Sequence, residues 1–167
     1  TKDFSGKNIN VEFVSANPTG PLHVGHVRGA VIGDVLSNIL KKVGYNVIKE
    51  YYVNDAGNQI NILAHSVFLR YKELIDKHKI QIPEGYYPGE YLIPIAKQLH
   101  EKYENQLINR NENSLKIIKD FSIKYILKTI KDDLYRLNIK MDIYSSEREL
   151  VSNLKVTKAI KELQNKN

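Results

Sequence analysis

Two histidines that bracket a glycine form the pattern with the clearest chemical meaning in this 167-residue chain. His23, Gly25 and His26 lie in the segment ANPTGPLHVGH, residues 16–26, where a turn rich in proline and glycine meets a run with helical periodicity. At a spacing of three residues on a helix, the two imidazoles lie on the same side and can point at one ligand. Because imidazole donates hydrogen bonds to phosphate oxygens in either neutral tautomer, the pattern predicts a phosphate-binding turn.

Two other interpretations of this pattern stay open. The histidines could be metal ligands, or polar residues that only start a helix. Gly25, Gly29 and Gly33 recur every four residues as a stripe without side chains, which favours a nucleotide at the first glycine or a tightly packed strand at the later ones. Since the chain has no cysteine and the two histidines have no further histidine clustered with them, we expect no protein metal site.

The elements on either side of the turn must position these side chains. Apolar and polar residues alternate over 9–15, which predicts a strand, and turn-forming residues follow at 17–21. Apolar residues recur at helical spacing over 24–43, and Gly44 is placed to end that helix. A loop at the carboxyl end of a strand, facing a positive helix N-terminus, suits an anionic ligand.

A second strand and a second helix follow in the same half of the chain. Residues 46–53 are β-branched and aromatic, which predicts a strand, and helical spacing begins near Ala56 and continues through Tyr71. Strand, helix, strand and helix in this order predict an α/β fold with parallel strands and right-handed crossovers.

The second half of the chain is predicted to be mostly helical. A loop rich in proline and glycine at 76–90 marks a boundary. Beyond it the patterns predict helices over 91–107 and 115–137 joined by a polar run at 109–113, a short strand at 141–144, a helix capped by Ser145 or Ser146 with Glu149 in a capping box, and a polar helix over 151–167.

The composition excludes several classes of protein. Apolar residues make up 42% and charged residues 26%, a globular balance. The absence of cysteine excludes disulfides and cysteine nucleophiles, and is compatible with a reducing cytoplasm. No stretch approaches the roughly 20 apolar residues of a membrane span and no basic-then-apolar leader opens the chain, so we expect a soluble protein with no membrane partner.

The net charge of +6 is unevenly distributed. Residues 1–76 hold eight Lys/Arg against seven Asp/Glu (+1), whereas residues 77–167 hold seventeen against twelve (+5). The basic second half indicates either a polyanionic partner or a solvated, lysine-rich helical surface.

The segment HVGH, after its turn, resembles the HIGH element of class I aminoacyl-tRNA synthetases. Residues 11–60 closely resemble the start of the catalytic domain of bacterial-type arginyl-tRNA synthetases, and GYYPGEYL (85–92) and LNIKMDIYSSERELV are also similar to that family. The resemblance implies the first half of a Rossmann-like nucleotide-binding fold over 1–76, followed by a mostly helical connective insertion over 77–167. In the family this insertion handles the acceptor end of tRNA, which agrees with its charge.

The resemblance also implies a reaction. Arginine and ATP give arginyl-adenylate and pyrophosphate, and arginine then passes to the 3′ end of tRNA(Arg). Mg²⁺ is expected to accompany ATP, and the parent enzyme is expected to be a cytoplasmic monomer. The HIGH-type motif comprises Ala16, Asn17, Pro18, Thr19, Gly20, Pro21, Leu22, His23, Val24, Gly25 and His26.

Individual roles follow from the resemblance. His23 and His26 are the implied catalytic residues, which hold the ATP phosphates and stabilise the charge that develops there. Gly25 lets the adenine approach the backbone, and Gly29 keeps the helix close to the sheet. The residues implied to contact arginine are Glu12, Ser15, Ala16, Asn17, Asp55 and Gln59.

An arginine site fits the chemistry of these residues, because a guanidinium group needs carboxylate and amide acceptors. Simpler interpretations also stand: Glu12 as a solvated strand residue, Asn17 as an Asx turn and Asp55 as a helix cap. Asp34 and Arg28 are expected to form surface or intersegment pairs. The tyrosines at 51, 52, 86, 87 and 91 are expected mainly in packing roles.

The sequence also departs from the family. Nothing resembles the KMSKS element, since Lys140 and Met141 are followed by Asp142. We therefore expect a fragment that does not aminoacylate by itself. Two alternative functions remain: a small HIGH-type adenylyltransferase, which requires a complete sheet within this length, and a non-catalytic tRNA-binding module, which requires salt-sensitive RNA binding without ATP affinity.

Overall fold

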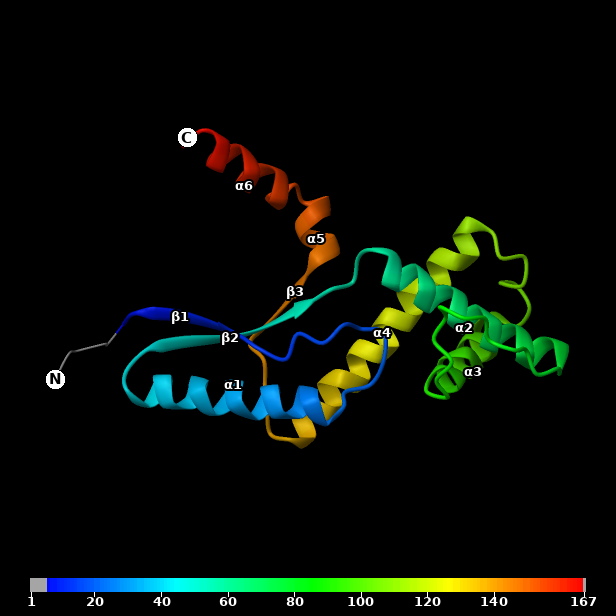
Figure 1. The fold of residues 1–167 in the computed structure, drawn as a ribbon, viewed down its shortest axis with the longest axis horizontal. Helices are drawn as coiled ribbons and strands as arrows, with labels where there is room; N and C mark the ends of the chain where they lie inside the picture. The colour runs from blue at the N-terminus through cyan, green and yellow to red at the C-terminus, as the bar shows by residue number, and fades with distance from the viewer. Residues whose placement is uncertain (1–5, 167) are drawn as a thin grey trace. The chain divides into compact units, whose positions relative to one another are not determined.

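The computed structural model describes residues 6–166 of the chain. Within these residues the elements run in the order β1 (Asn8–Glu12), α1 (Val24–Lys42), β2 (Asn46–Val53), α2 (Asn58–Asp76), α3 (Leu92–Tyr103), α4 (Glu112–Arg136), β3 (Ile143–Ser146), α5 (Glu147–Ser152) and α6 (Lys155–Gln164) (Figure 1). The α/β class predicted from the sequence is confirmed. No helix among the described residues is long and apolar enough to cross a bilayer.

Contacts divide the chain into two compact units. The sheet unit consists of the described residues of 1–17, 22–55 and 131–167, and the helical unit consists of 18–21 and 56–130. The boundary at residue 76, between the first half of the nucleotide-binding fold and the connective insertion, stays a prediction.

The sheet unit contains a parallel sheet of order β1-β2-β3. Asn8 pairs with Asn46 at the start of the β1–β2 ladder, and Val53 pairs with Ser146 at the end of the β2–β3 ladder. The parallel pairing predicted for the first two strands is therefore confirmed. Because all the strands run the same way, their carboxyl ends meet at one edge, where ligands bind in open parallel sheets.

The first strand ends three residues earlier than predicted. Phe13 N–H still donates to Glu50 O (3.2 Å), but Val14 and Ser15 have φ angles of 66° and 43°. Left-handed backbone is unfavourable for L-residues, above all for a β-branched one such as valine, and it breaks the ladder. The side-chain alternation continues to residue 15, so the sequence carries no signal of this break.

The helix α1 ends within one residue of its predicted end and packs on the sheet through Ala30, Gly33 and Ser37. A Cβ atom on Gly33 would lie 2.2 Å from Cγ of Phe13, so this glycine admits the phenyl ring. A Cβ atom on Gly29 would meet nothing within 4 Å. The packing role predicted for Gly29 is wrong and belongs to Gly33, because Gly33 faces the residue that leaves β1.

A polar contact also ties α1 to the sheet. Lys49 of β2 is buried, and its Nζ contacts Asp34 Oδ1 at 2.6 Å and Asn38 Oδ1 at 3.1 Å. The prediction that Asp34 forms an intersegment pair is confirmed.

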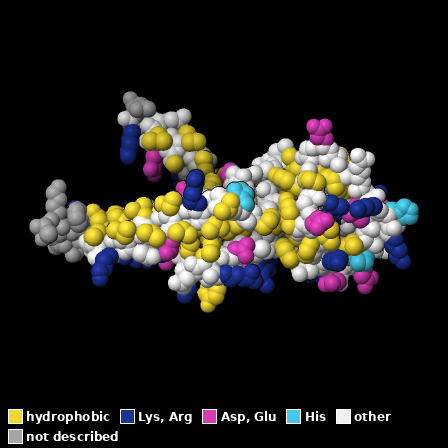
Figure 2. Space-filling model, turned by 60° about the horizontal axis from the view of Figure 1, so that its bottom comes forward, with side chains coloured by type: hydrophobic (Ala, Val, Ile, Leu, Met, Phe, Trp, Pro, Cys, Tyr) yellow, Lys and Arg dark blue, Asp and Glu magenta, His cyan; other side chains and the backbone are white. Residues whose placement is uncertain are grey.

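Much of the apolar surface of α1 faces away from the sheet. Hydrophobic side chains gather over this helix in Figure 2. The exposed residues include Val31, Ile32, Val35, Leu36, Ile39 and Val43. Contiguous apolar surface of this kind marks an interaction face in soluble proteins.

The helical unit has a well-buried core contributed by α2, α3 and α4. Its fully buried side chains include Leu63, Val67, Tyr71, Leu92, Ile95, Leu99, Ile118 and Ile130. Tyr71 also accepts a hydrogen bond from Leu107 N–H (3.4 Å), and its hydroxyl donates to Glu104 O. This network holds the turn after α3, which ends at Tyr103 rather than at the predicted residue 107.

Local capping shifts the other helix boundaries. The helix α2 starts at Asn58, after Gly57 with φ 82°, rather than near Ala56. The helix α4 starts at Glu112 rather than 115, where Asn111 Oδ1 accepts from Ser114 N–H at 2.8 Å. The predicted polar linker therefore supplies an N-terminal cap.

The last elements follow the prediction in type but not in position. The strand β3 lies at 143–146 rather than 141–144, because Asp142 bonds Lys49 twice: its Oδ2 accepts from Lys49 N–H (2.8 Å) and its own N–H donates to Lys49 O (2.9 Å). Ser146 caps α5 by accepting from Glu149 N–H at 3.1 Å. The polar helix predicted over 151–167 is interrupted at Leu154, where φ is 56°.

Candidate active site

The histidine pair lies at the N-terminus of α1, as the sequence predicts. His23 is the N-cap residue, and its Nδ1 accepts from Gly25 N–H at 3.2 Å. In return, His23 N–H donates to Nδ1 of His26 at 3.3 Å. The two rings stack with centroids 3.7 Å apart and planes inclined by 20°. The histidines thus form a reciprocal cap that holds both rings on one side of the helix start.

These contacts fix the tautomer of both rings. A nitrogen that accepts from a backbone N–H carries no proton, so each neutral imidazole bears its proton on Nε2. Burial, and secondarily the charge of His23, lowers the pKa of His26 below its ordinary value. The lowered pKa favours the neutral form of His26, and the hydrogen bonds at Nδ1 leave an Nε2–H donor on each ring for a ligand.

The glycine between the histidines gives the His23 ring room to lie against the helix start. A Cβ atom on Gly25 would lie 3.0 Å from Cε1 and 3.2 Å from Nδ1 of His23. A side chain there would require the His23 ring to shift by a few tenths of an ångström. Since the first turn of α1 contains no acidic side chain, its positive helix end is available to an anion.

Negatively charged side chains, in contrast to the positive N-terminus of α1, lie at the carboxyl ends of the strands. Glu12, the last residue of β1, accepts a hydrogen bond from the Ser15 hydroxyl, and Ser15 Oγ accepts from Tyr52 N–H at 3.0 Å. The left-handed backbone at Ser15 brings this hydroxyl back to Glu12. The structure therefore brings together two of the residues implied to contact arginine.

Tyr52 connects this pair to two further carboxylates. Burial raises the pKa of Tyr52, and the negative charges of Glu147, Asp55 and Glu12 raise it further, together with a hydrogen bond to Glu147. Carboxylates that follow or end three strands therefore all act on the titration of one phenol. No role was predicted for Glu147, and only a packing role was predicted for Tyr52. The available signal was the position of both residues at strand ends.

Asp55 is buried and already engaged. Its Oδ2 accepts from Ser146 Oγ at 2.7 Å, and its Oδ1 accepts from Arg148 N–H at 3.0 Å. Arg148 Nε also lies 3.9 Å from Oδ2. Asp55 is not the cap of α2, whose N-cap is Gly57. Its carboxylate anchors the start of α5 to the end of β2.

The other predicted residues are distributed over both units. Ala16 is buried, and its carbonyl accepts from the Tyr51 hydroxyl at 2.7 Å, while Asn17 is exposed in the sheet unit. Tyr51 is fully buried, which confirms its packing role, and this burial raises its pKa. Gln59 lies in the first turn of α2, in the helical unit.

The middle of the motif packs within the helical unit. Residues 18–21 belong to that unit, where Thr19 O accepts from the Tyr91 hydroxyl at 2.6 Å. A Cβ atom on Gly20 would lie 3.5 Å from the same ring, and Pro21 lines an apolar pocket beside it. Val24, the first residue of α1, is exposed. The motif therefore consists of a loop at 18–21, which is hydrogen-bonded to Tyr91, followed by the histidine cap of α1.

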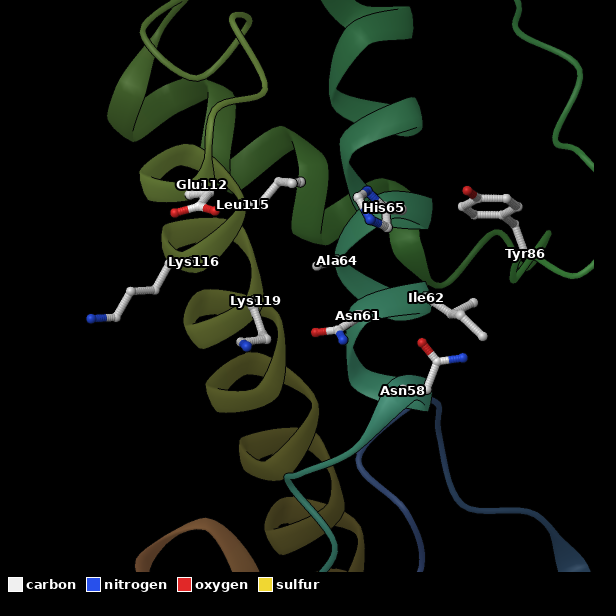
Figure 3. Close-up of a pocket in the computed structure, with 10 residues that line it drawn as sticks. All are labelled: Asn58, Asn61, Ile62, Ala64, His65, Tyr86, Glu112, Leu115, Lys116 and Lys119. Carbon is white, nitrogen blue, oxygen red and sulfur yellow. The ribbon is translucent and has the colours of Figure 1, made fainter. Parts of the chain in front are cut away.

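A separate pocket of about 570 Å³ lies between α2 and α4 in the helical unit (Figure 3). Its lining includes Asn58, Asn61, His65, Glu112, Lys116 and Lys119, and none of the predicted site residues. His65 Nδ1 accepts from Arg110 at 3.1 Å, and burial and this guanidinium lower the pKa of His65. Within residues 6–166, no group of three or more His, Asp or Glu side chains could hold a metal ion.

Comparisons with known proteins agree with this geometry. Residues 2–167 match the family model described as tRNA synthetases class I (R), catalytic domain. The chain is 56% identical over 156 residues to an arginine–tRNA ligase of Rickettsia bellii, which covers 93% of the chain and 27% of the relative. It is 52% identical to an arginine–tRNA ligase of Ehrlichia chaffeensis, over 97% of the chain and 28% of the relative.

A solved structure shows the same fold. A crystal structure from Campylobacter jejuni, which its name assigns to the arginyl-tRNA synthetases, aligns with a TM-score of 0.83 at 42% identity, over 96% of this chain and 35% of that one. The chain thus spans little more than a quarter of the length of its curated relatives. With the histidine cap and the parallel sheet in place, the match over residues 2–167 shows that this chain belongs to the class I tRNA synthetases of the arginine (R) type, within their catalytic domain.

Proposed function

We propose that the protein containing these residues is an arginine–tRNA ligase, which activates arginine with ATP and transfers it to the 3′ end of tRNA(Arg). The observation that carries the proposal is the histidine cap of α1, with two Nε2–H donors at a positive helix end. Arginine–tRNA ligases are also the curated relatives of the chain. The adenylyltransferase alternative required a complete sheet, whereas the described residues form three strands.

The proposed role of the histidines is electrostatic. The arginine carboxylate attacks the α-phosphorus of ATP, the bond to the bridging oxygen breaks, and pyrophosphate leaves with additional negative charge. His23 and His26 donate from Nε2 to phosphate oxygens, and the α1 N-terminus stabilises the same charge. Because Nδ1 of each ring is held by a backbone N–H, the donors need no reorganisation during the reaction.

The carboxylates at the strand ends are proposed to select the amino acid. Glu12 is exposed and held by Ser15, so it can accept from a guanidinium group. Glu147, which is hydrogen-bonded to Tyr52, adds a further negative charge to this region. Because Asp55 already accepts hydrogen bonds from Ser146 and Arg148, we propose that it positions α5 and does not itself bind arginine. Asn17, Ala16 and Gln59 keep the proposed substrate roles implied by the family resemblance.

We further propose that Mg²⁺ accompanies ATP, as the counterion of its phosphates, and that the whole enzyme acts as a monomer. The proposed division places the first half of the nucleotide-binding fold at 1–76 and the connective insertion at 77–167. The isolated chain is expected to show no steady-state charging of tRNA.

A chimera tests the proposal. The matching segment of the Rickettsia bellii arginine–tRNA ligase is replaced by this chain, and arginylation of tRNA(Arg) is measured. We expect the chimera to charge tRNA(Arg) with arginine. The variants His23→Ser and His26→Ser should each lower kcat by about 10²–10³-fold, because each removes a donor to the developing charge.

The controls separate catalysis from folding. Serine at position 23 is itself a good N-cap, so the His23→Ser variant should keep its thermal stability while it loses activity. His78→Ser replaces an exposed histidine of the helical unit and should charge normally. Glu12→Gln should raise KM for arginine by at least about tenfold, since it removes one charge from a charge-assisted hydrogen bond. Unchanged charging by both serine variants at 23 and 26 would contradict the proposal.

A further inference from the structure

The segment GYYPGEYL, residues 85–92, has no role in the function proposed above. Its last tyrosine, Tyr91, is half-buried at the N-cap position of α3, next to the fully buried Leu92. The Tyr91 hydroxyl donates to Thr19 O at 2.6 Å, and both residues belong to the helical unit. The segment therefore supplies a side chain that contacts the loop of the HIGH-type motif.

The Tyr91 ring also fits closely against two glycines. A Cβ atom on Gly20, in the motif loop, would lie 3.5 Å from Cζ and 3.5 Å from the hydroxyl oxygen of Tyr91. A Cβ atom on Gly89 would lie 2.2 Å from Cε1 of the same ring, so a side chain there would force the ring to move. Gly89 therefore leaves room for the ring at the position from which its hydroxyl reaches Thr19.

The backbone just before Tyr91 is fixed to α2 within the same unit. Ser66 Oγ accepts from Tyr87 N–H at 2.9 Å, and Arg70 Nη2 donates to Pro88 O at 2.8 Å. Ser66 is buried, and α2 packs against α3. Two packed helices therefore hold the backbone on both sides of Tyr91, and a side chain on such a support can position another segment.

The loop that Tyr91 contacts leads directly into the histidine cap. Only residues 20–22 lie between Thr19 and His23, and one of them is Pro21, whose ring fixes its own φ angle. A shift of the Thr19 carbonyl therefore has few rotatable bonds in which it could be absorbed before it reaches His23.

We propose that Tyr91 is a positioning residue for the adenylate-forming step, because it restrains the loop from which the chain enters the histidine cap. Its hydroxyl takes no part in the chemistry, since it donates to a backbone carbonyl. The identity of this reaction rests on the proposed function, whereas the restraint on the loop does not. Loss of the restraint should lower kcat rather than raise KM, since misplaced histidine donors weaken contacts to charge that develops in the transition state.

Tyr71 provides a matched comparison in the helical unit. It is fully buried, and its hydroxyl donates to the backbone carbonyl of Glu104 and accepts from Leu107 N–H. Neither partner belongs to the motif. Tyr71→Phe and Tyr91→Phe therefore remove the same atom from the same kind of hydrogen bond, in one case at a purely structural position and in the other at the motif loop.

The first experiment measures arginylation of tRNA(Arg) by the chimera described above. Tyr91→Phe should lower kcat about five- to tenfold and leave KM for ATP and for arginine within about twofold, and Tyr91→Leu should lower kcat about 10²-fold. Tyr71→Phe should keep kcat, although thermal melts should show at least as large a loss of stability. An unchanged kcat in Tyr91→Phe, or equal losses in the two phenylalanine variants, would overturn the proposal.

Gly89→Ala tests the same contact from the other side of the ring. It should lower kcat about tenfold in the chimera, because the added methyl group displaces the Tyr91 ring. In the Tyr91→Leu background, where no ring is left to displace, the same substitution should lower kcat by less than about threefold. Additive losses would contradict the proposal.

A measurement without charging keeps this test separate from that of the proposed function. Hydrogen–deuterium exchange is followed by mass spectrometry in the complete 167-residue chain, without ATP or arginine. Tyr91→Phe should raise exchange over 17–26 about threefold and leave α2 unchanged, whereas Tyr71→Phe should leave 17–26 unchanged. If the chimera does not charge tRNA, the proposed function fails, and exchange still decides whether Tyr91 restrains the loop. Unchanged exchange over 17–26 in Tyr91→Phe would overturn that restraint.

Discussion

The two units bury their helices to very different extents. In the helical unit, α2 and α3 contribute fully buried side chains such as Leu63, Tyr71 and Leu99. In the sheet unit, α1 buries Ala30, Gly33 and Ser37, and its larger apolar residues face outward. Both helices of 19 residues, α1 and α2, are predicted from the same kind of periodicity. Amphipathic spacing therefore identifies a helix but does not show which side of it is covered.

The two units also position their polar groups in different ways. The sheet unit positions its groups through polar contacts at element ends, namely the histidine cap, the link between Ser15 and Glu12, and the anchor at Asp55. The helical unit positions the side chains of the pocket between α2 and α4 on helices that are held by a dense core.

The largest expected effect comes from one substitution made in both units. Leu99→Ala empties a fully buried position and should cost about 2–5 kcal/mol in the free energy of unfolding. Leu36→Ala removes the same atoms from a side chain that is 47% exposed, and should change that free energy by less than about 1 kcal/mol. Urea denaturation followed by circular dichroism measures both. Equal costs would show that the face of α1 is covered in solution.

A second pair of substitutions should have effects of opposite sign on one helix. Gly33→Ala places a methyl group within 2.2 Å of the Phe13 ring and should destabilise the chain by about 1–3 kcal/mol. Gly29→Ala meets open space and should stabilise the chain by about 0.5–1 kcal/mol through helix propensity. Thermal melts of the two variants give the comparison. If Gly29→Ala also destabilised the chain, Gly29 could not face open space, and this prediction would be wrong.

The smallest expected effect concerns two histidines, one in each unit. Burial is the main cause that lowers the pKa of His26 and of His65, and a neighbouring cation, His23 or Arg110, adds to it. His23→Ser and Arg110→Gln should therefore raise the pKa of the neighbouring histidine without restoring its ordinary value of 6.5. NMR titration of the ring protons follows each group. Complete return to 6.5 would contradict burial as the main cause.

The lowered pKa values of His26 and His65 also predict how the free energy of unfolding changes with pH. A histidine whose folded pKa is lowered binds fewer protons in the folded state than in the unfolded state. The stability it supports is fully present above the unfolded value of 6.5 and is lost as the pH falls through the folded pKa. Unfolding measured at pH 8 and at mildly acidic pH should show lower stability at the lower pH.

Local patterns predicted much of the fold and part of the site. The spacing of His23 and His26 after a turn predicted two rings on one side of a helix start, and the rings are stacked there. The boundaries of β2 are as predicted, and those of α1 are within one residue. These features depend on neighbours within a few residues, so the sequence contains the information that decides them.

The remaining features depend on residues far apart in the chain. The break of β1 at Val14 has no local signal, and it places Ser15 where its hydroxyl meets both Glu12 and the backbone of Tyr52. Asp55 is engaged by residues 91 and 93 positions later, so its partners could not be read from its surroundings in sequence.

The sequence by itself determined the periodic elements, the parallel order of the first two strands and the position of the two histidines at a helix start. Tertiary structure decided which glycine admits Phe13, which side of α1 is covered and where the carboxylates gather. The reason is physical: periodicity and capping act over one or two turns, whereas the environment of a side chain is set by whichever distant element packs against it.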